Sequence, residues 1–318
     1  MEITDRFDDN TKISSYKDCP RKYFLRHVMN WRSEGTAVPL VFGLSWHEAL
    51  SVIWTHAQQA NKRDLREAAI GKFNEIWQGE GMSIDMNMEQ LEALSPRTPN
   101  IAEEMLHNYI EDRWNVLSNA RVVSDEQPFA VPIPNTERSW YVGRLDKVIE
   151  YNGQLLVIEH KTTSIYKKDG GFQSSYVEGW YSDSQVKGYQ FGAGIYYPGL
   201  TQVWVDAALV HKTVHDKFRF IPVSHSFPLI KEWLDDTSEY IARIKTDEIK
   251  FHERGTLSGG TFPKNENSCF GKFGSCSFLD VCRTTADIPP DAAVPVGYMI
   301  ERWSPFETLG LEKILNKE

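Results

Sequence analysis

The sequence predicts an α/β protein in three consecutive parts, and three observations support this. Residues 1–120 carry apolar side chains at helical spacing, and residues 121–250 contain β-branched runs separated by turn signals. Residues 251–318 are rich in Gly, Pro and Cys and contain few apolar runs. We therefore expect a helical N-terminal part, a mixed core, and a C-terminal region that is held by its cysteines.

The N-terminal part is expected to contain four helices. Ser14 or Ser15 can cap the first helix, and Asn100 can cap the last. The expected helices cover residues 16–28, 44–59, 63–77 and 100–117. Residues 79–100 combine Gly, Met, Ser and Pro, so an irregular link is expected there.

The core is expected to begin with a β-hairpin. Residues 140–150 and 154–160 read as strands, and Asn152-Gly153 between them is the strongest short-range hairpin signal. After the hairpin we expect a helix over 183–196, strands over 202–210 and 218–223, and a helix over 229–249.

The hairpin brings two acidic residues face to face. A two-residue turn pairs Tyr151 with Gln154 and places Asp146 opposite Glu159, while Lys161 projects from the same face as Glu159. Facing carboxylates repel each other, and a divalent cation would compensate. Two carboxylates and a lysine can hold Mg²⁺ or Mn²⁺ and hydrolyse a phosphodiester. The alternative is an ion network on a solvated sheet.

Cysteine usage indicates a second site. The chain has four cysteines, Cys19, Cys269, Cys276 and Cys282. In a reducing compartment such a set indicates a metal site more often than disulfides. Gaps of six and five residues within the C-terminal three are wider than zinc pairs use, so a [4Fe–4S] cluster is favoured over zinc. Unrelated buried thiols are the remaining alternative.

Composition limits the function classes. The formal net charge is −9, which argues against a protein that coats nucleic acid through bulk charge but allows a local basic groove. No apolar run is long enough for a membrane span, and the N-terminus lacks the pattern of a secretory signal. We therefore expect a cytoplasmic protein.

Six segments, in this order, resemble motifs of one family: 14–23 around Cys19-Pro20, 43–48 around His47, 143–146, 158–162, 185–189 with its Gln-x-x-x-Tyr pattern, and 276–282. The sequence resembles the PD-(D/E)xK nuclease superfamily, specifically the RecB-like exonuclease branch with an iron–sulfur cluster. That branch includes CRISPR-associated RecB-like exonucleases, the AddB nuclease domain and phage relatives.

The resemblance implies a restriction-endonuclease-like fold, with a central mixed β-sheet flanked by helices. It implies that His47, Asp146, Glu159 and the His160 carbonyl hold the metal and that Lys161 is catalytic. It further implies that Gln185 and Tyr189 lie over the site and that the four cysteines hold a [4Fe–4S] cluster. Two points fit less closely. Relatives commonly have two residues where this chain has six, between Cys269 and Cys276. Glu126 resembles the family's acidic position before the sheet only weakly.

The activity implied is a metal-dependent DNA exonuclease, acting at single-stranded ends in recombination, repair or phage DNA processing. A non-catalytic iron–sulfur DNA-binding adaptor and an endonuclease are the alternatives. Trp180, Tyr181 and Tyr189 are candidates for stacking on bases or for core packing. No helicase P-loop is present in the sequence, so unwinding would need a helicase or recombination partner.

Overall fold

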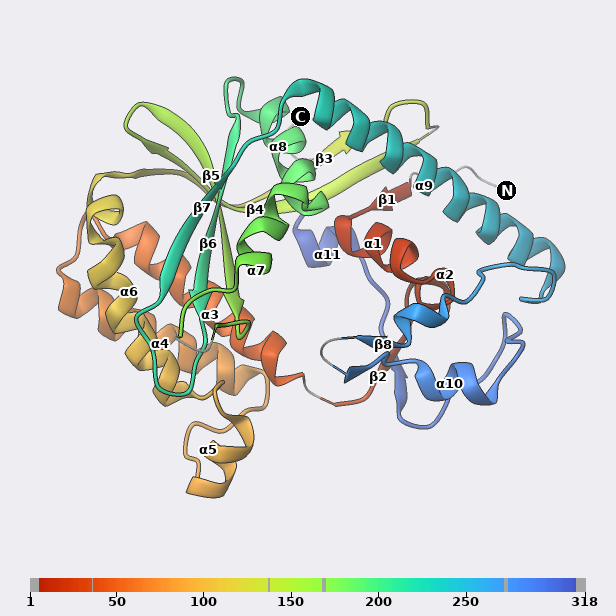
Figure 1. The fold of residues 1–318 in the computed structure, drawn as a ribbon, viewed down its shortest axis with the longest axis horizontal. Helices are drawn as coiled ribbons and strands as arrows, with labels where there is room; N and C mark the ends of the chain where they lie inside the picture. The colour runs from red at the N-terminus through yellow and green to blue at the C-terminus, as the bar shows by residue number, and fades with distance from the viewer. Residues whose placement is uncertain (1–5, 36, 137, 168–169, 272–273, 313–318) are drawn as a thin grey trace. The chain divides into compact units, whose positions relative to one another are not determined.

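Two compact units interleave along the chain. The computed structural model describes residues 6–35, 37–136, 138–167, 170–271 and 274–312 (Figure 1). Unit 1 comprises Met1–Gly35, Pro128–Gly143 and Ser226–Glu318, and unit 2 comprises Thr36–Gln127 and Arg144–His225. The division into three consecutive parts, over residues 1–120, 121–250 and 251–318, stays a prediction.

Unit 2 contains the helical segment and most of the sheet. Its helical elements are α3 (Val38–His56), α4 (Lys62–Gly79), α5 (Met88–Leu94), α6 (Pro99–Asn119), α7 (Ser174–Gly179), the 3₁₀ turn η2 (Trp180–Ser182) and α8 (Ser184–Tyr196). Its strands are β5 (Gln154–Thr163), β6 (Gln202–Leu209) and β7 (Phe218–Val223), together with parts of β3 (Arg121–Pro132) and β4 (Ser139–Tyr151). Residues 79–100 are therefore not wholly irregular, because α5 forms behind an Asn87 capping box.

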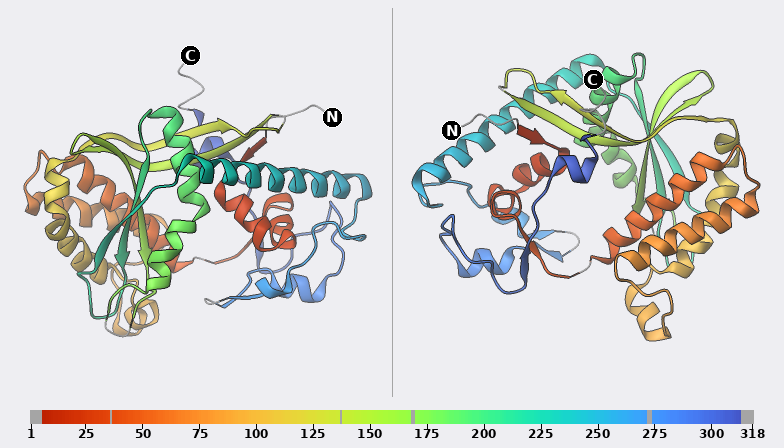
Figure 2. Two further views of the ribbon diagram at one scale, coloured as in Figure 1. Left: turned by 45° about the horizontal axis from the view of Figure 1, so that its top comes forward. Right: turned by 180° about the vertical axis from the view of Figure 1, so that it is seen from behind.

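The sheet of unit 2 is mixed, as the sequence predicts. β4 and β5 are antiparallel, β5 and β6 are parallel, and β6 and β7 are antiparallel. The parallel pair requires a crossover connection, which α7 and α8 supply. One face of the sheet packs on α3, α4 and α6 through Ile149, Ile158 and Ala208, whereas α8 packs on the other face (Figures 1 and 2).

The predicted hairpin is confirmed in type and register. Asn152 and Gly153 have φ of 51° and 73°, the two positive values that a type I′ turn requires. Tyr151 pairs with Gln154, and the ladder continues in this register as far as Lys147 and Ile158. The odd-numbered residues of β5 therefore share one face and the even-numbered residues the other.

Unit 1 is built from the two ends of the chain. Its elements are β1 (Arg6–Asp8), α1 (Asn10–Asp18), α2 (Pro20–Tyr23), the π-helical turn η1 (Phe24–Val28), β2 (Trp31–Ser33), α9 (Phe227–Arg254), η3 (Glu266–Ser268), β8 (Phe270–Gly271), β9 (Gly274–Ser275), α10 (Leu279–Thr284), β10 (Tyr298–Ile300) and α11 (Pro305–Leu309), with the remaining parts of β3 and β4. Its core joins Tyr23 and Phe24 to Phe251, Phe262 and Phe278. The C-terminal region therefore packs on the N-terminal helices through aromatic side chains as well as carrying cysteines.

The first helix differs from the prediction of one helix over 16–28. Asp9, rather than Ser14 or Ser15, caps α1 by accepting from Lys12 N. α1 then ends at Asp18, and Cys19 is extended, with φ of −159° and ψ of 113°. Pro20 is the cause, because a proline disfavours the helical conformation in the residue before it. The break separates Cys19 from the regular backbone on either side.

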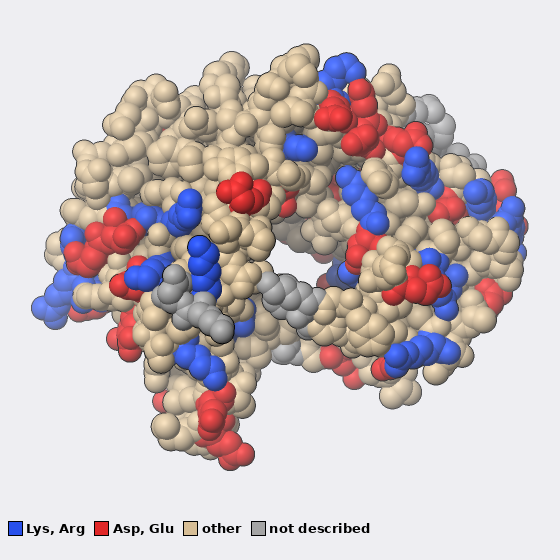
Figure 3. Space-filling model, viewed as in Figure 1, with Lys and Arg blue, Asp and Glu red and all other residues tan. Residues whose placement is uncertain are grey.

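Surface charge is mixed. On the face drawn in Figure 3, Lys and Arg side chains are interspersed with Asp and Glu side chains rather than gathered in one basic field. No helix in the described part of the chain is long and apolar enough to cross a membrane.

Candidate functional site

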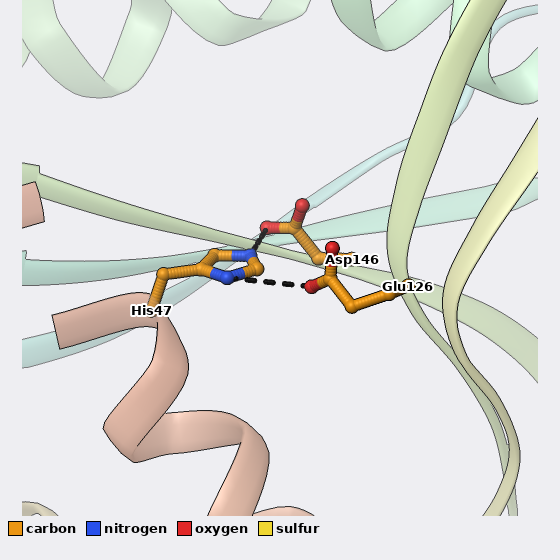
Figure 4. Close-up of side chains that lie close together, drawn as sticks. All are labelled: His47, Glu126 and Asp146. Carbon is orange, nitrogen blue, oxygen red and sulfur yellow. Dashed lines mark ion pairs between the residues drawn. The ribbon is translucent and has the colours of Figure 1, made fainter. Parts of the chain in front are cut away.

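His47 projects from α3 toward two carboxylates. Neighbouring positions of α3, including Trp46 and Leu50, are buried in the core of unit 2, which fixes the helix against the sheet. The His47 imidazole lies 2.9 Å from Asp146 Oδ2 through Nε2 and 3.3 Å from Glu126 Oε1 through Nδ1 (Figure 4). A helix and two strands therefore converge on one point.

Asp146 lies where the hairpin ladder ends. The backbone pairing of β4 and β5 stops at Lys147, one residue before Asp146. The Asp146 carboxylate instead accepts a hydrogen bond from the backbone N–H of His160, with an Oδ2–N distance of 2.8 Å. This carboxylate takes the place of a backbone partner at the point where the strands separate, so its position is fixed.

Glu159 and Lys161 share a face of β5, as the alternation of the strand predicts. Lys161 Nζ lies 2.5 Å from Glu159 Oε1. The second oxygen, Glu159 Oε2, is buried and has no hydrogen-bond partner among the described residues. A buried carboxylate oxygen without a partner is costly, and a cation would satisfy it.

Glu126 is the ligand candidate that the sequence indicated only weakly. It lies on β3, a strand absent from the sequence-based prediction, and its φ of 50° is in the left-handed region. Such a kink is typical of a β-bulge, which re-aims a side chain beside an active site. Glu126 Oε2 also lies 2.7 Å from Arg144 Nε. A positive φ at a glutamate leaves no strong sequence signal, and so the sequence indicates Glu126 only weakly.

The charges of these groups are strongly coupled. Burial lowers the pKa of His47, but Asp146 and Glu126 outweigh burial and raise it to about 9. Burial raises the pKa of Asp146, but His47 outweighs burial and holds it well below its usual range. Burial and the charge of Asp146 together raise the pKa of Glu159 to about 8. Burial opposes the charge of Lys161, but Glu159 and Asp146 raise its pKa, so the lysine is cationic.

The ligand atoms of His47, Glu126 and Asp146 fit a single ion. All three lie within 4.8 Å of one another, and in the described ranges they form the one such group of His, Cys, Asp or Glu side chains. Carboxylate oxygens suit Mg²⁺ and Mn²⁺, and the imidazole favours the later ions. Glu159 lies outside this tight group, and its unpartnered oxygen is a further candidate donor. The residues present therefore fit a divalent cation.

His160 donates its backbone N–H to Asp146, and its buried ring contacts the His47 ring edge to face, with centroids 5.8 Å apart. His160 Nδ1 also lies 3.2 Å from Asp206 Oδ2. Asp206 is held by Arg113, with an Nη2–Oδ1 distance of 2.9 Å, and accepts from the Tyr109 hydroxyl. This buried network holds β5 beside the site, and the role of the His160 carbonyl as a ligand stays a prediction.

Gln185 and Tyr189 contact each other on α8. Gln185 Nε2 donates to Tyr189 Oη over 2.8 Å, and Tyr189 is only 7% exposed. Asp183 caps α8. Burial lowers the pKa of Lys161, but Glu159 and Asp146 raise it, and Asp183 adds a smaller effect in the same direction. The start of α8 is therefore close to the lysine. Tyr189 is too buried to stack on a base, whereas Tyr181 is 46% exposed.

The four cysteines all belong to unit 1 and are all free thiols. Asn265 N donates to Cys19 Sγ over 3.4 Å, and Cys276 N donates to Cys269 O over 2.9 Å. Burial raises the pKa of Cys282. The charges of Lys264 and Arg21 act to lower this pKa, whereas Cys19 and Cys276 raise it further. These groups are therefore close enough to Cys282 to influence its charge.

The sulfurs of the cysteines are not gathered into a tight group. Within the described residues no three of these sulfurs lie within 4.8 Å of one another. Burial lowers the pKa of Arg21, although Cys282 and Cys19 act in the opposite direction, and Arg21 Nη1 is buried without a hydrogen-bond partner among the described residues.

The comparisons with known proteins identify a family. The family model of the PD-(D/E)XK nuclease superfamily matches residues 10–283. A protein from Eubacterium rectale provisionally named an exonuclease is 14% identical, with a TM-score of 0.48, over 93% of this chain and 91% of its own. An alkaline exonuclease from Laribacter hongkongensis is 12% identical, with a TM-score of 0.30, over 67% of this chain and 93% of its own. Both likenesses are too distant to carry an argument. No curated protein matches the chain.

Proposed function

Because the chain belongs to the PD-(D/E)XK nuclease superfamily, we propose that unit 2 hydrolyses phosphodiester bonds of DNA with a divalent cation held by His47, Glu126, Asp146 and Glu159. The observation that carries the proposal is the unpartnered buried oxygen of Glu159, on a carboxylate held between Lys161 and the charge of Asp146. A bound Mg²⁺ or Mn²⁺ would act as a Lewis acid toward the phosphodiester and lower the pKa of a bound water.

Each residue of the site has a distinct task. Lys161 stays cationic, so it can orient the attacking water and balance the negative charge that develops on the phosphate. His160 N–H and His47 hold the Asp146 carboxylate in place. Asp183 anchors the start of α8, which keeps Gln185 and Tyr189 near the lysine. The buried Asp206 network keeps β5, which carries Glu159 and Lys161, in its register.

Within this function we propose an exonuclease of the RecB-like branch, acting at single-stranded DNA ends in recombination, repair or phage DNA processing. The ordered motifs from Cys19 to Cys282 support the branch. The half-exposed Tyr181 supports single strands, because aromatic rings stack on bases without reading their sequence. Unwinding of a duplex would be supplied by a helicase partner.

End-labelled linear and circular single-stranded DNA, each incubated with Mn²⁺ or Mg²⁺, would test this proposal. We expect nucleotides to be released from the linear substrate only. Cutting of the circle would instead assign an endonuclease. Tight binding without any cleavage of either substrate, with all four ligand residues intact, would assign a non-catalytic binding protein.

We further propose that Cys19, Cys269, Cys276 and Cys282 bind one [4Fe–4S] cluster in unit 1. The buried Arg21 guanidinium and the Asn265 N–H bond to Cys19 support an anionic group at these sulfurs. Free thiolates require a reducing compartment, which agrees with a cytoplasmic location. Protein purified without oxygen should contain about four irons and four acid-labile sulfides per chain. One zinc per chain in a colourless, stable protein would contradict the cluster.

A further inference from the structure

Arg97 is a half-buried cation beside the strand that carries the catalytic candidates. It immediately precedes Thr98, the N-cap of α6. Its Nη2 donates to the Ser164 hydroxyl over 3.1 Å, and its Nε is buried without a hydrogen-bond partner among the described residues. Ser164 follows directly on β5 (Gln154–Thr163), three residues after Lys161. Three extended residues span about 10 Å, so Ser164 lies about 10 Å along the chain from Lys161, and Arg97 is held there by its contact with Ser164.

No carboxylate among the described residues neutralises the Arg97 guanidinium. Across the described ranges, Arg97 forms no ion pair, and burial lowers its pKa with no neighbouring charge acting on it. Arg113, in the same unit, provides the contrast. Burial likewise opposes the charge of Arg113, but Asp206 at 2.9 Å outweighs burial and raises its pKa. Arg113 is therefore neutralised within the fold, whereas Arg97 is not.

A partly desolvated cation without a counter-charge destabilises a fold, and a bound anion would offset that cost. Its one side-chain hydrogen bond leaves Nη1 of Arg97 without a partner in the described structure. The planar guanidinium matches phosphate oxygens, and a serine hydroxyl can donate to the same group. The pair thus has the donors and the charge of a phosphate site.

We propose that Arg97 and Ser164 bind a phosphate of the substrate strand, one that flanks the phosphodiester held at Glu159 and Lys161. This proposal rests on the proposed function, because it takes the substrate to be a nucleic-acid strand that runs past the end of β5. It assigns Arg97 to substrate binding rather than to the folding of unit 2.

The test measures binding and stability on the same variants. A 5′-fluorescein oligothymidylate would be titrated at several salt concentrations without metal, so that no cleavage occurs, and thermal unfolding would be followed without DNA. For Arg97→Gln we expect about tenfold weaker binding and a loss of about 0.7 from the slope of log K against log salt, the contribution of one phosphate contact on a single strand. We expect its Tm to be unchanged or raised, because a desolvated charge has been removed.

Two arginine variants serve as controls. Arg113→Gln should lower the Tm, because it leaves Asp206 buried without its partner. Arg63→Gln changes an exposed arginine paired with Glu67 and should leave binding, slope and Tm as in the wild type. Arg97→Lys keeps the charge, so it should retain the salt slope while binding with intermediate affinity.

Each outcome bears on a definite claim. A wild-type affinity and slope in Arg97→Gln would overturn the phosphate site. A lowered Tm with unchanged binding would show a structural role and would overturn it as well. Wild-type cleavage is scored separately with Mn²⁺. If the wild-type protein cleaves DNA but its binding does not depend on Arg97, only the phosphate site is overturned. If the wild-type protein neither binds nor cleaves DNA, both the phosphate site and the proposed function are overturned.

Discussion

Asp146 and Glu159 lie on one hairpin face, yet their carboxyl groups are in opposite electrostatic situations. Asp146 is paired with His47 and accepts the His160 N–H, so its charge is well stabilised. Glu159 is buried, is repelled by Asp146, and keeps one oxygen without a partner. The repulsion between the facing carboxylates therefore destabilises the charged form of Glu159 more than that of Asp146.

This difference predicts opposite effects on stability from two inactivating changes. Asp146→Asn and Glu159→Gln should each lower the rate of DNA cleavage by about a thousandfold, since each removes a metal ligand. In metal-free protein, Glu159→Gln should raise the Tm and Asp146→Asn should lower it. Calorimetry and a nuclease assay would measure both. Glu150→Gln, on the same hairpin in an exposed pair with Arg121, is the control and should change neither. Normal cleavage by either variant would remove that residue from the site.

The imidazole of His47 predicts the preferred metal. Imidazole binds Mn²⁺ better than Mg²⁺, so Mn²⁺ should support cleavage at least as well as Mg²⁺. His47→Ala should weaken Mn²⁺ binding more than Mg²⁺ binding, as measured by titration calorimetry. His56→Ala, at the exposed end of the same helix, should leave both affinities unchanged. An equal loss for the two ions would place His47 outside the ligand set.

His27 in unit 1 predicts a pH dependence of stability. Burial, with smaller effects of Lys12 and Arg26, lowers the pKa of His27 from 6.5 to about 3. The unfolded chain therefore binds this proton first as the pH falls, so the stabilisation is complete above pH 6.5 and is lost between pH 6.5 and 3. His27→Gln should remove up to about 3 kcal/mol of the decrease in unfolding free energy between pH 7 and pH 4. Denaturant unfolding of both proteins at several pH values would measure it, and parallel pH profiles would contradict it.

At the scale of elements, the β4–β5 hairpin decides where the site forms. Its type I′ turn fixes the register, and the register places Asp146 and Glu159 at the end where the strands separate. The sequence predicted this hairpin because an Asn-Gly turn is a local property of the chain. It missed β3, which pairs with β4 and is interrupted by the positive φ of Glu126, so its residues give no regular strand signal.

Two glycines, one in the hairpin turn and one in a helix, should respond in opposite ways to substitution by alanine. Gly153 has φ of 73°, so Gly153→Ala should lower the free energy of unfolding by about 1 kcal/mol. Gly71 lies within α4, and an added Cβ would contact nothing within 4 Å. Gly71→Ala should therefore raise the free energy of unfolding by up to about 1 kcal/mol, because alanine has the higher helix propensity. Urea unfolding would measure both changes. Equal effects of the two substitutions would argue against a strained turn.

At the scale of the whole molecule, the chain ends are brought together in unit 1. Cys19 and Cys269 are 250 positions apart, and Asn265, near Cys269 in sequence, donates to Cys19 Sγ. The proposed cluster would close this long loop and, by analogy with a disulfide, restrict the unfolded chain by about 5 kcal/mol. All four cysteines lie in unit 1, so we expect its loss to act there first.

This arrangement predicts that loss of the cysteine site affects one unit. Cys19→Ser should expose amides in residues 262–300 to hydrogen exchange, while the strands β5 and β6 of unit 2 keep their protection. Exchange measured by mass spectrometry on both proteins would show it. Ser268→Ala, beside the site but not a ligand candidate, should leave the exchange pattern close to that of the wild type. Uniform loss of protection in both units would contradict a local role.

The sequence by itself determined the α/β class and the hairpin with its register. These are properties of short segments: Asn152-Gly153 sets its own turn, and alternation along β5 puts Glu159 and Lys161 on one face. The tertiary structure decided which groups meet. Glu126 joins His47 and Asp146 because a kinked strand aims it there, and Arg97 has no counter-charge among the described residues. Burial and pairing depend on segments distant in sequence, so no local pattern records them.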